Sequence, residues 1–151
     1  GQLAESLRSD SRVVNMENTD IRMVSAENIG GQADFICADV SFISLTKILP
    51  KIAELLKSEG TAAVLIKPQF EAGKSDIGKK GIVKDRKVHL RILKELDGFM
   101  RLSGLMPVSC TYSPVKGGSG NIEYLAKLVK CSEERAIPDY SGIVEEAFRQ
   151  L

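Results

Sequence analysis

The sequence is poor in residues that bind metal ions, with one histidine and three cysteines among its 151 residues. Cys37, Cys110 and Cys131 lie far apart, no CxxC pair occurs, and His89 has no potential ligand at a useful spacing. A metal site is therefore not expected. We interpret the three cysteines as buried or half-buried thiols in a reducing cytoplasm, and His89 as a surface or half-buried residue without a catalytic role.

Long apolar runs are also missing. No segment approaches the roughly 20 residues that cross a bilayer, and residues 1–10 lack the basic-then-apolar order of a signal peptide. These absences predict a cytoplasmic protein without membrane activity. The formal net charge is only +1, so binding to nucleic acid would depend on a local basic surface. Neither a GxGxxG dinucleotide motif nor a Walker loop occurs.

What is present indicates one folded α/β domain. Hydrophobic residues make up 43% and charged residues 27% of the chain, a balance that argues against disorder. The hydrophobic periodicity predicts strands over residues 12–16, 33–40, 61–67, 105–112 and 122–130, and helices over residues 1–9, 44–58, 85–103 and 141–150. This alternation indicates a largely parallel sheet that closes with an antiparallel hairpin at one edge.

Two predicted elements have informative details. The nearly continuous apolar character of residues 33–40 favours a strand in a sheet that is covered on both faces. Helix 44–58 contains Pro50, so we expect a break near Leu49 and an end at Glu59-Gly60. In helix 85–103, Asp85 is the expected N-cap and Gly104 follows the last turn. Its expected core face consists of Val88, Ile92, Leu96, Phe99 and Met100.

Three ionisable residues lie at the ends of predicted strands, where open α/β sheets bind their ligands. Asp39 lies at the end of the strand of residues 33–40, Lys67 ends the strand of residues 61–67, and Glu123 opens the last strand. Each has an ordinary alternative, because an Asp after a strand often caps a helix and a Lys there often reaches solvent. Together they favour a polar site at one edge of the sheet.

Four segments carry a resemblance to a known family: ADVSFISL (38–45), IKPQFEAG (66–73), GIVKD (81–85) and SGNIEY (119–124). They resemble the haemolysin A (TlyA) family, whose members are similar to FtsJ-type ribose methyltransferases. The resemblance implies a Rossmann-like class I methyltransferase fold over residues 1–151. It also implies S-adenosylmethionine as the cofactor, and 2′-O-methylation of cytidines in 16S and 23S ribosomal RNA as the activity. Ribosomal RNA or ribosomal subunits would then be the partner.

The family's catalytic Lys-Asp-Lys-Glu set matches this chain at three positions: Asp39, Lys67 and Glu123. Lys67 would accept or polarise the proton of the ribose 2′-hydroxyl, and the two carboxylates would orient the lysines. The resemblance places the cofactor's methionine end beside Asp39, Ser41 and Phe42.

The adenine would lie beside the turn that contains Thr19 and Asp20. Asp20 could accept a hydrogen bond from the exocyclic amine, although a helix cap or an Asx turn is an equal alternative for this residue.

The same resemblance places the first catalytic lysine, the glycine-rich cofactor loop and an S4 domain before Gly1, so we expect this chain alone to be inactive. Two other hypotheses remain open: a non-catalytic RNA-binding remnant of the same fold, and a membrane-active haemolysin. The family name suggests the second, although no long apolar segment supports it.

A basic segment follows the IKPQFEAG segment. Residues 73–84 contain Lys74, Lys79, Lys80 and Lys84 among three glycines. We interpret the segment as a mobile loop whose lysines contact RNA phosphates. A solvated loop whose charges serve solubility is the alternative.

Overall fold

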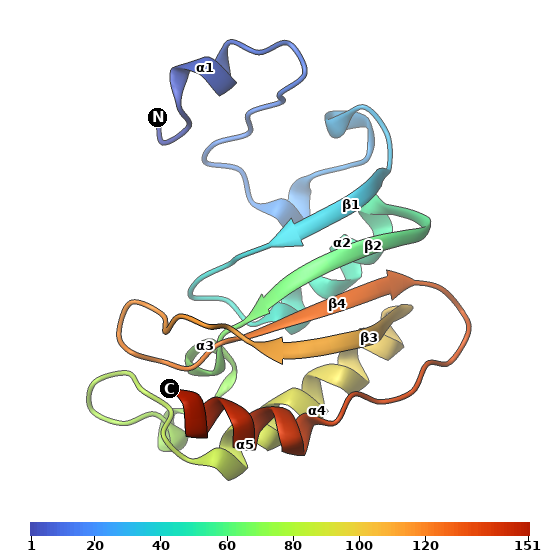
Figure 1. The fold of residues 1–151 in the computed structure, drawn as a ribbon. Coiled ribbons are helices and arrows are strands. Elements are labelled where there is room, and N and C mark those ends of the chain that lie inside the picture. The colour runs from blue at the N-terminus through green and yellow to red at the C-terminus, as the bar shows by residue number, and fades with distance from the viewer.

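The computed structural model describes all 151 residues and contains a single four-stranded sheet (Figure 1). The strands are β1 (Ala33–Ala38), β2 (Leu56–Ile66), β3 (Leu105–Tyr112) and β4 (Tyr124–Lys130). The α-helices are α1 (Glu5–Arg8), α2 (Leu49–Leu55), α3 (Pro68–Glu71), α4 (Arg86–Leu102) and α5 (Tyr140–Gln150). Four short 3-10 helices are η1 (Ile21–Met23), η2 (Glu27–Ile29), η3 (Leu45–Lys47) and η4 (Lys74–Asp76).

The strand order is β1-β2-β4-β3, with β1 parallel to β2 and β4 antiparallel to both of its neighbours. Three strands therefore run in one direction and the last strand runs against them, which confirms the predicted sheet and its closing hairpin. Ala38 pairs with Val64, and Ile66 pairs with Tyr124. This register brings the C-terminal ends of β1 and β2 to the same end of the sheet as the start of β4.

Local signals explain the longest helix. The Asp85 carboxylate accepts a hydrogen bond from the Lys87 N–H at 2.8 Å and caps α4, as predicted. Gly104 has a φ of 75° just after the helix and allows the chain to turn back into β3. Residues 88, 92, 96 and 100 are buried, but the assignment of Phe99 to the core is wrong, because its side chain is 49% exposed. Phe99 lies about 100° around the helix from Met100, at the margin of the apolar stripe.

The break expected near Leu49 is confirmed, since η3 ends at Lys47 and α2 begins at Leu49 with Pro50 in its first turn. The helix ends earlier than expected, at Leu55. Residues from Leu56 onward join β2, and Glu59 takes the left-handed conformation with a φ of 60°.

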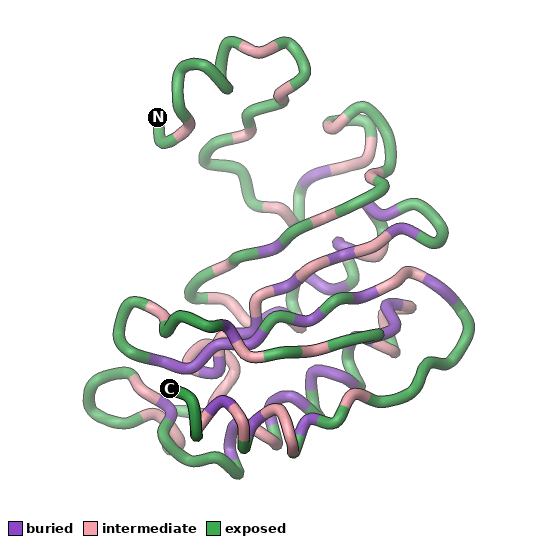
Figure 2. The backbone as a smooth tube through the Cα atoms, in the orientation of Figure 1, coloured by how far each residue is buried: buried purple, intermediate pink, exposed green.

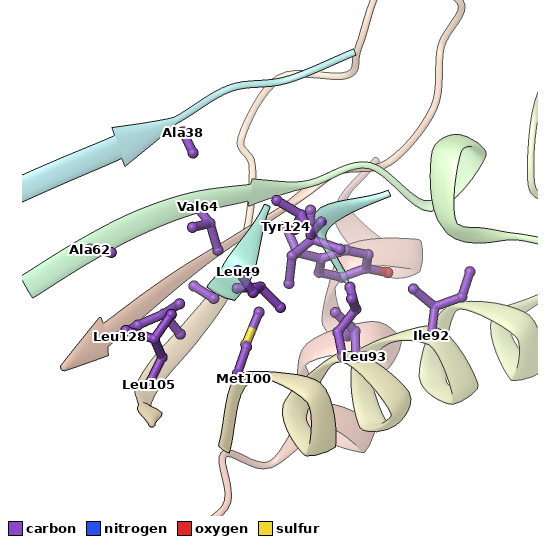
Figure 3. Close-up of a cluster of buried hydrophobic side chains, with 14 of the residues drawn as sticks. Ala38, Leu49, Ala62, Val64, Ile92, Leu93, Met100, Leu105, Tyr124 and Leu128 are labelled. Atoms are coloured by element: carbon purple, nitrogen blue, oxygen red, sulfur yellow. The ribbon is translucent and has the colours of Figure 1, made fainter. Parts of the chain in front are cut away.

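One hydrophobic cluster lies between the sheet and helices α2, α4 and α5 (Figure 3). Val64 and Leu128 from the sheet face Leu93 and Met100 of α4 there, and Tyr124 lies among them. The expectation of a sheet covered on both faces is wrong for this chain. Phe35 is 57% exposed and Leu125 is 40% exposed on the opposite face.

The same open face corrects the interpretation of the cysteines. Cys37 lies on the edge strand β1 and is exposed, whereas Cys110 is half-buried and Cys131 is buried. An edge strand without a helix over one face cannot shield alternate side chains from solvent.

The first 32 residues lie beyond β1 and bury little (Figure 2), with Val24 as their one buried residue. Of the helix expected over residues 1–9, only the single turn α1 forms, and it buries no side chain. The strand expected over residues 12–16 is absent: these residues form a turn and irregular backbone, and Val14 is 62% exposed. A β-branched pair favours extended backbone, but a strand also needs a neighbour to bond with, and none lies beside this segment. None of the helices combines the length and the apolar character that a membrane-spanning helix requires.

Candidate active site

The candidate site lies at the end of the sheet where β1 and β2 finish and β4 begins. Three connections gather there: the segment after β1, the segment through α3, and the loop between β3 and β4 (Figure 1). The structure thus places Asp39, Lys67 and Glu123 at one end of the sheet, as the sequence predicts. This is the end at which open α/β sheets bind their ligands.

Lys67 and Asp39 form the centre of the site. The Lys67 Nζ lies 2.6 Å from Asp39 Oδ1, and the two residues leave the ends of adjacent parallel strands. The lysine side chain is only 13% exposed, whereas the Asp39 side chain is 70% exposed. The amine is therefore held in place beneath a carboxylate that faces solvent.

Ser41 and Phe42 lie beside this pair. The Lys67 Nζ donates a hydrogen bond to Ser41 Oγ at 3.1 Å. Phe42 has a φ of 62° and is 91% exposed, and its ring centroid lies 5.0 Å from that of Phe70. A phenylalanine in the left-handed region is strained, and such strain is concentrated at functional sites. These contacts bring Ser41 next to the lysine and place Phe42 against Phe70, whose ring centroid lies 6.0 Å from the Lys67 Nζ.

Glu123 is held differently. Its side chain is nearly buried, with the residue 7% exposed, and its Oε1 accepts a hydrogen bond from Gln69 Nε2 at 2.9 Å. No hydrogen bond or ion pair joins Glu123 directly to Lys67 or Asp39. The connection between the two halves of the site runs through the segment Lys67-Pro68-Gln69.

Glu71, at the end of α3, connects the segment that follows β2 to the residues that follow β1. Its carboxylate accepts hydrogen bonds from the Ser44 hydroxyl at 2.6 Å and from the Leu45 N–H at 2.8 Å. Burial raises the pKa of Glu71, although both hydrogen bonds act in the opposite direction. Lys67, Gln69 and Glu71 therefore reach three different parts of the site. Their spacing of two residues within the KPQFE motif is the sequence signal that would have identified Gln69 and Glu71.

The interpretation of His89 as a surface or half-buried residue is wrong, because it is fully buried. Its Nδ1 lies 2.8 Å from the Tyr124 hydroxyl and its Nε2 lies 2.9 Å from the Val83 carbonyl oxygen. A neutral ring satisfies both contacts, since Nε2–H donates to Val83 and Nδ1 accepts from Tyr124. Burial lowers the pKa of His89. A lone histidine in a helix gives no signal of this role, which depends on a residue 35 positions away.

The basic segment begins and ends at fixed points. Asn121, 1% exposed, accepts from the Val83 N–H at 3.1 Å and donates to the Gly81 carbonyl at 2.9 Å. Asp76 forms an ion pair with Arg91 at 2.7 Å. The four lysines at positions 74, 79, 80 and 84 are exposed and make no ion pair or side-chain hydrogen bond. Residues 73–84, called the basic loop below, therefore carry unpaired positive charges on a backbone that is held in place by these contacts.

Asp20 and Thr19 lie in the exposed N-terminal segment. Asp20 is the N-cap of η1 and accepts from the Arg22 N–H at 2.9 Å. Hydrogen bonds from Arg22 lower the pKa of Asp20 to about 2. The contact with the Arg22 N–H corresponds to the alternative in which Asp20 caps a helix. Thr19 Oγ1 donates to the Glu17 carbonyl at 3.3 Å. The cofactor role of both residues stays a prediction. No cluster of three or more potential metal ligands occurs in the structure.

The strand order and the polar site at the strand ends define a Rossmann-like α/β domain. The profile of the FtsJ-like methyltransferases matches residues 1–130, so the chain belongs to the FtsJ-like methyltransferase family. This match confirms the resemblance that the four sequence segments indicate.

Individual relatives agree with the family assignment. The chain is similar to YqxC of Bacillus subtilis, a protein named as an rRNA methyltransferase, with 43% identity over 99% of this chain and 56% of the relative. It is similar to the 16S/23S rRNA (cytidine-2′-O)-methyltransferase TlyA of Mycobacterium tuberculosis, with 39% identity over 91% of this chain and 51% of TlyA. It thus spans about half the length of these relatives.

A solved structure of a protein named as a hemolysin from Streptococcus thermophilus is also similar to this chain. Its TM-score is 0.93 and its sequence identity is 38%, and the match covers 99% of this chain and 55% of that protein.

Proposed function

We propose that the protein containing this chain transfers a methyl group from S-adenosylmethionine to a ribose 2′-hydroxyl of cytidine in ribosomal RNA. The observation that carries the proposal is the Lys67–Asp39 pair, 2.6 Å apart at the ends of two parallel strands, in a chain of a methyltransferase family. Because ribosomal RNA is the proposed substrate, the proposed location is the cytoplasm.

The residues present fit S-adenosylmethionine, which supplies an electrophilic methyl group on a sulfonium and also carries an ammonium group. Asp39 offers a largely exposed carboxylate whose one ion-pair partner is Lys67. A second cation can approach such a carboxylate from the solvent side. Phe42, three residues after Asp39, adds an exposed ring that packs against Phe70. We assign Asp39, Ser41 and Phe42 to the methionine end of the cofactor, and Thr19 and Asp20 to the adenine.

Lys67 is the proposed proton-handling group. A ribose hydroxyl is a weak nucleophile because it holds its proton tightly, so a group that accepts or polarises that proton favours attack. Asp39 and Ser41 fix the position of the Lys67 amine, and Gln69 connects the same segment to Glu123. Most of the acceleration would come from holding two substrates in line.

The RNA partner is supported by the basic loop. Lys74, Lys79, Lys80 and Lys84 are exposed and unpaired, and the loop that carries them is tied by Asn121 to the segment that leads into Glu123. Phosphates held by these lysines would lie at the same end of the molecule as the site. The contacts would orient RNA without reading its sequence.

The test is a methylation assay on the complete gene product that contains this chain. Ribosomal subunits lacking the modification are incubated with labelled S-adenosylmethionine, and the RNA is digested to nucleosides. We expect label in 2′-O-methylcytidine, and a label lower by about 10²–10⁴-fold when Lys67→Ala replaces the wild type. Label on a base, or no label above the Lys67→Ala background, would contradict the proposal.

A further inference from the structure

We propose that Gln69 is a positioning residue that fixes the direction of the Glu123 carboxylate; this inference rests on the proposed methyltransferase function. The Gln69 side chain leaves the one-turn helix α3, two residues after Lys67. Its Nε2 donates to Glu123 Oε1 at 2.9 Å, and no other protein group donates a hydrogen bond to that carboxylate. A nearly buried carboxylate without an ion-pair partner depends on each donor that it has.

The other end of the Gln69 amide supports this role. Gln69 Oε1 is buried and has no hydrogen-bond partner. Turning the amide over would place its oxygen against the Glu123 oxygen, two acceptors in contact, so the orientation follows from chemistry. An apolar side chain would avoid the unsatisfied oxygen, but it would also remove the one donor to Glu123. The unsatisfied acceptor therefore indicates that the amide is present for what it donates.

The backbone at Gly117 restricts the position of the Glu123 carboxylate from another side. A Cβ added at Gly117 would lie 2.3 Å from Glu123 Oε1 and 2.8 Å from its Cδ, which is closer than atoms can approach. The neighbouring Gly118 has nothing within 4 Å of the equivalent position. The backbone at residue 117 is fixed in turn, because its N–H donates to the Asn121 carbonyl at 2.9 Å. Glu123 is thus held between an amide and a side-chain-free stretch of backbone.

The experiment compares two variants with two matched controls in the complete gene product. Gln69→Leu removes the donor and Gly117→Ala displaces the carboxylate. Gln32→Leu removes a surface amide that donates to the Glu54 carbonyl at 2.9 Å, and Gly118→Ala adds the same methyl group one residue away. The measurements are kcat and KM for methyl transfer to ribosomal subunits, together with the melting temperature.

We expect Gln69→Leu and Gly117→Ala each to lower kcat by about 10²-fold, as small misplacements of reacting groups do, with KM for RNA nearly unchanged. The double variant should be little worse than either single one, because both changes misplace the same carboxylate. Both controls should retain wild-type kcat. A normal kcat in Gln69→Leu, or a loss fully explained by a lower melting temperature, would overturn the proposal.

A readout without activity separates this inference from the proposed function. Crystal structures of the variants should show the Glu123 carboxylate displaced in Gln69→Leu and Gly117→Ala, and in place in Gly118→Ala. If the wild type transfers no methyl group, the proposed function fails and these structures decide the role of Gln69. A carboxylate that stays in place in both variants would overturn it.

Discussion

Two regions at the same end of the sheet handle charge in opposite ways. At the strand ends, the Lys67 side chain is 13% exposed, and its amine contacts Asp39 at 2.6 Å. In the basic loop, four lysines are exposed and without partners. A paired, half-enclosed amine has a fixed position, which chemistry on one bond requires. Unpaired charges in solvent attract a polyanion from any direction, and salt screens that attraction.

The largest effect is expected at Lys67. Lys67→Ala should lower methyl transfer by about 10²–10⁴-fold, the range typical of a proton-transfer group. Cofactor binding and fold should be nearly unchanged, because the truncation removes an amine at the rim more than core packing. Turnover and binding of S-adenosylmethionine by the complete gene product are the measurements.

Lys67→Arg tests what the amine does. A guanidinium can keep the contact with Asp39, but it stays protonated and cannot accept the hydroxyl proton. We expect Lys67→Arg to fail as Lys67→Ala does. Near-normal turnover would show that the residue only supplies positive charge, and the proton-accepting role would have to be withdrawn.

The basic loop should affect RNA binding rather than turnover. Replacing Lys74, Lys79, Lys80 and Lys84 by Ala should weaken binding to ribosomal RNA and flatten its salt dependence. Each lost phosphate contact should reduce the slope of log affinity against log salt by about 0.7–0.9. The measurement is a titration at several salt concentrations.

A charge-matched control replaces four exposed lysines elsewhere in the chain, at positions 47, 57, 94 and 127. It should leave the slope close to that of the wild type. Equal slopes in the two quadruple variants would show that the loop lysines act only through overall charge or serve solubility.

The sequence predicts those features of the molecule that depend on local patterns, and it misses those that depend on contacts between distant residues. Strand–helix alternation was sufficient for the sheet and for α4, because apolar periodicity and the cap at Asp85 are local signals. It was also sufficient to bring Asp39 and Lys67 together, since adjacent parallel strands end at one edge. Glu123, the partner of Gln69, lies 54 residues away, and Tyr124, the side-chain partner of His89, lies 35 residues away, so no local pattern contains these pairs.

Long-range pairing also explains where prediction failed. The segment of residues 12–16 has strand-like residues but no neighbouring strand, and Cys37 lies on a strand whose outer face no helix covers. Burial and strand formation are properties of the assembled sheet. They cannot be read from a five-residue window when the other side of the contact is unknown.

His89 joins the two regions, because it contacts Val83 at the end of the basic loop and Tyr124 next to Glu123. His89→Phe should lower the free energy of unfolding by about 1–3 kcal/mol, since it leaves a buried hydroxyl and a carbonyl without their partner. Urea unfolding at pH 7.5 is the measurement, and an unchanged midpoint would contradict the anchoring role.

The difference between wild type and His89→Phe should depend on pH. Burial lowers the pKa of folded His89 below the ordinary value of 6.5. As the pH falls through 6.5, the unfolded chain takes up a proton that the folded chain does not, so the wild type loses stability. His89→Phe lacks this loss, and the gap between the two should narrow from pH 7.5 to pH 5.5. A gap that widens would mean that the folded state favours the charged ring.

Asp20 should show the smallest effect. It tests whether a carboxylate that is already paired can also bind the cofactor. Its carboxylate already binds the Arg22 N–H and guanidinium, at 2.9 Å and 2.6 Å. If it also accepts a hydrogen bond from the adenine amine, Asp20→Ala should weaken S-adenosylmethionine binding about tenfold, the value of one hydrogen bond to a charged group. Asp10→Ala is the matched control, because Asp10 binds Arg12 in the same way, with its Oδ1 2.9 Å from the Arg12 backbone nitrogen. Calorimetric titration of both variants decides the matter: equal affinities would leave Asp20 as a helix cap and remove it from the cofactor site.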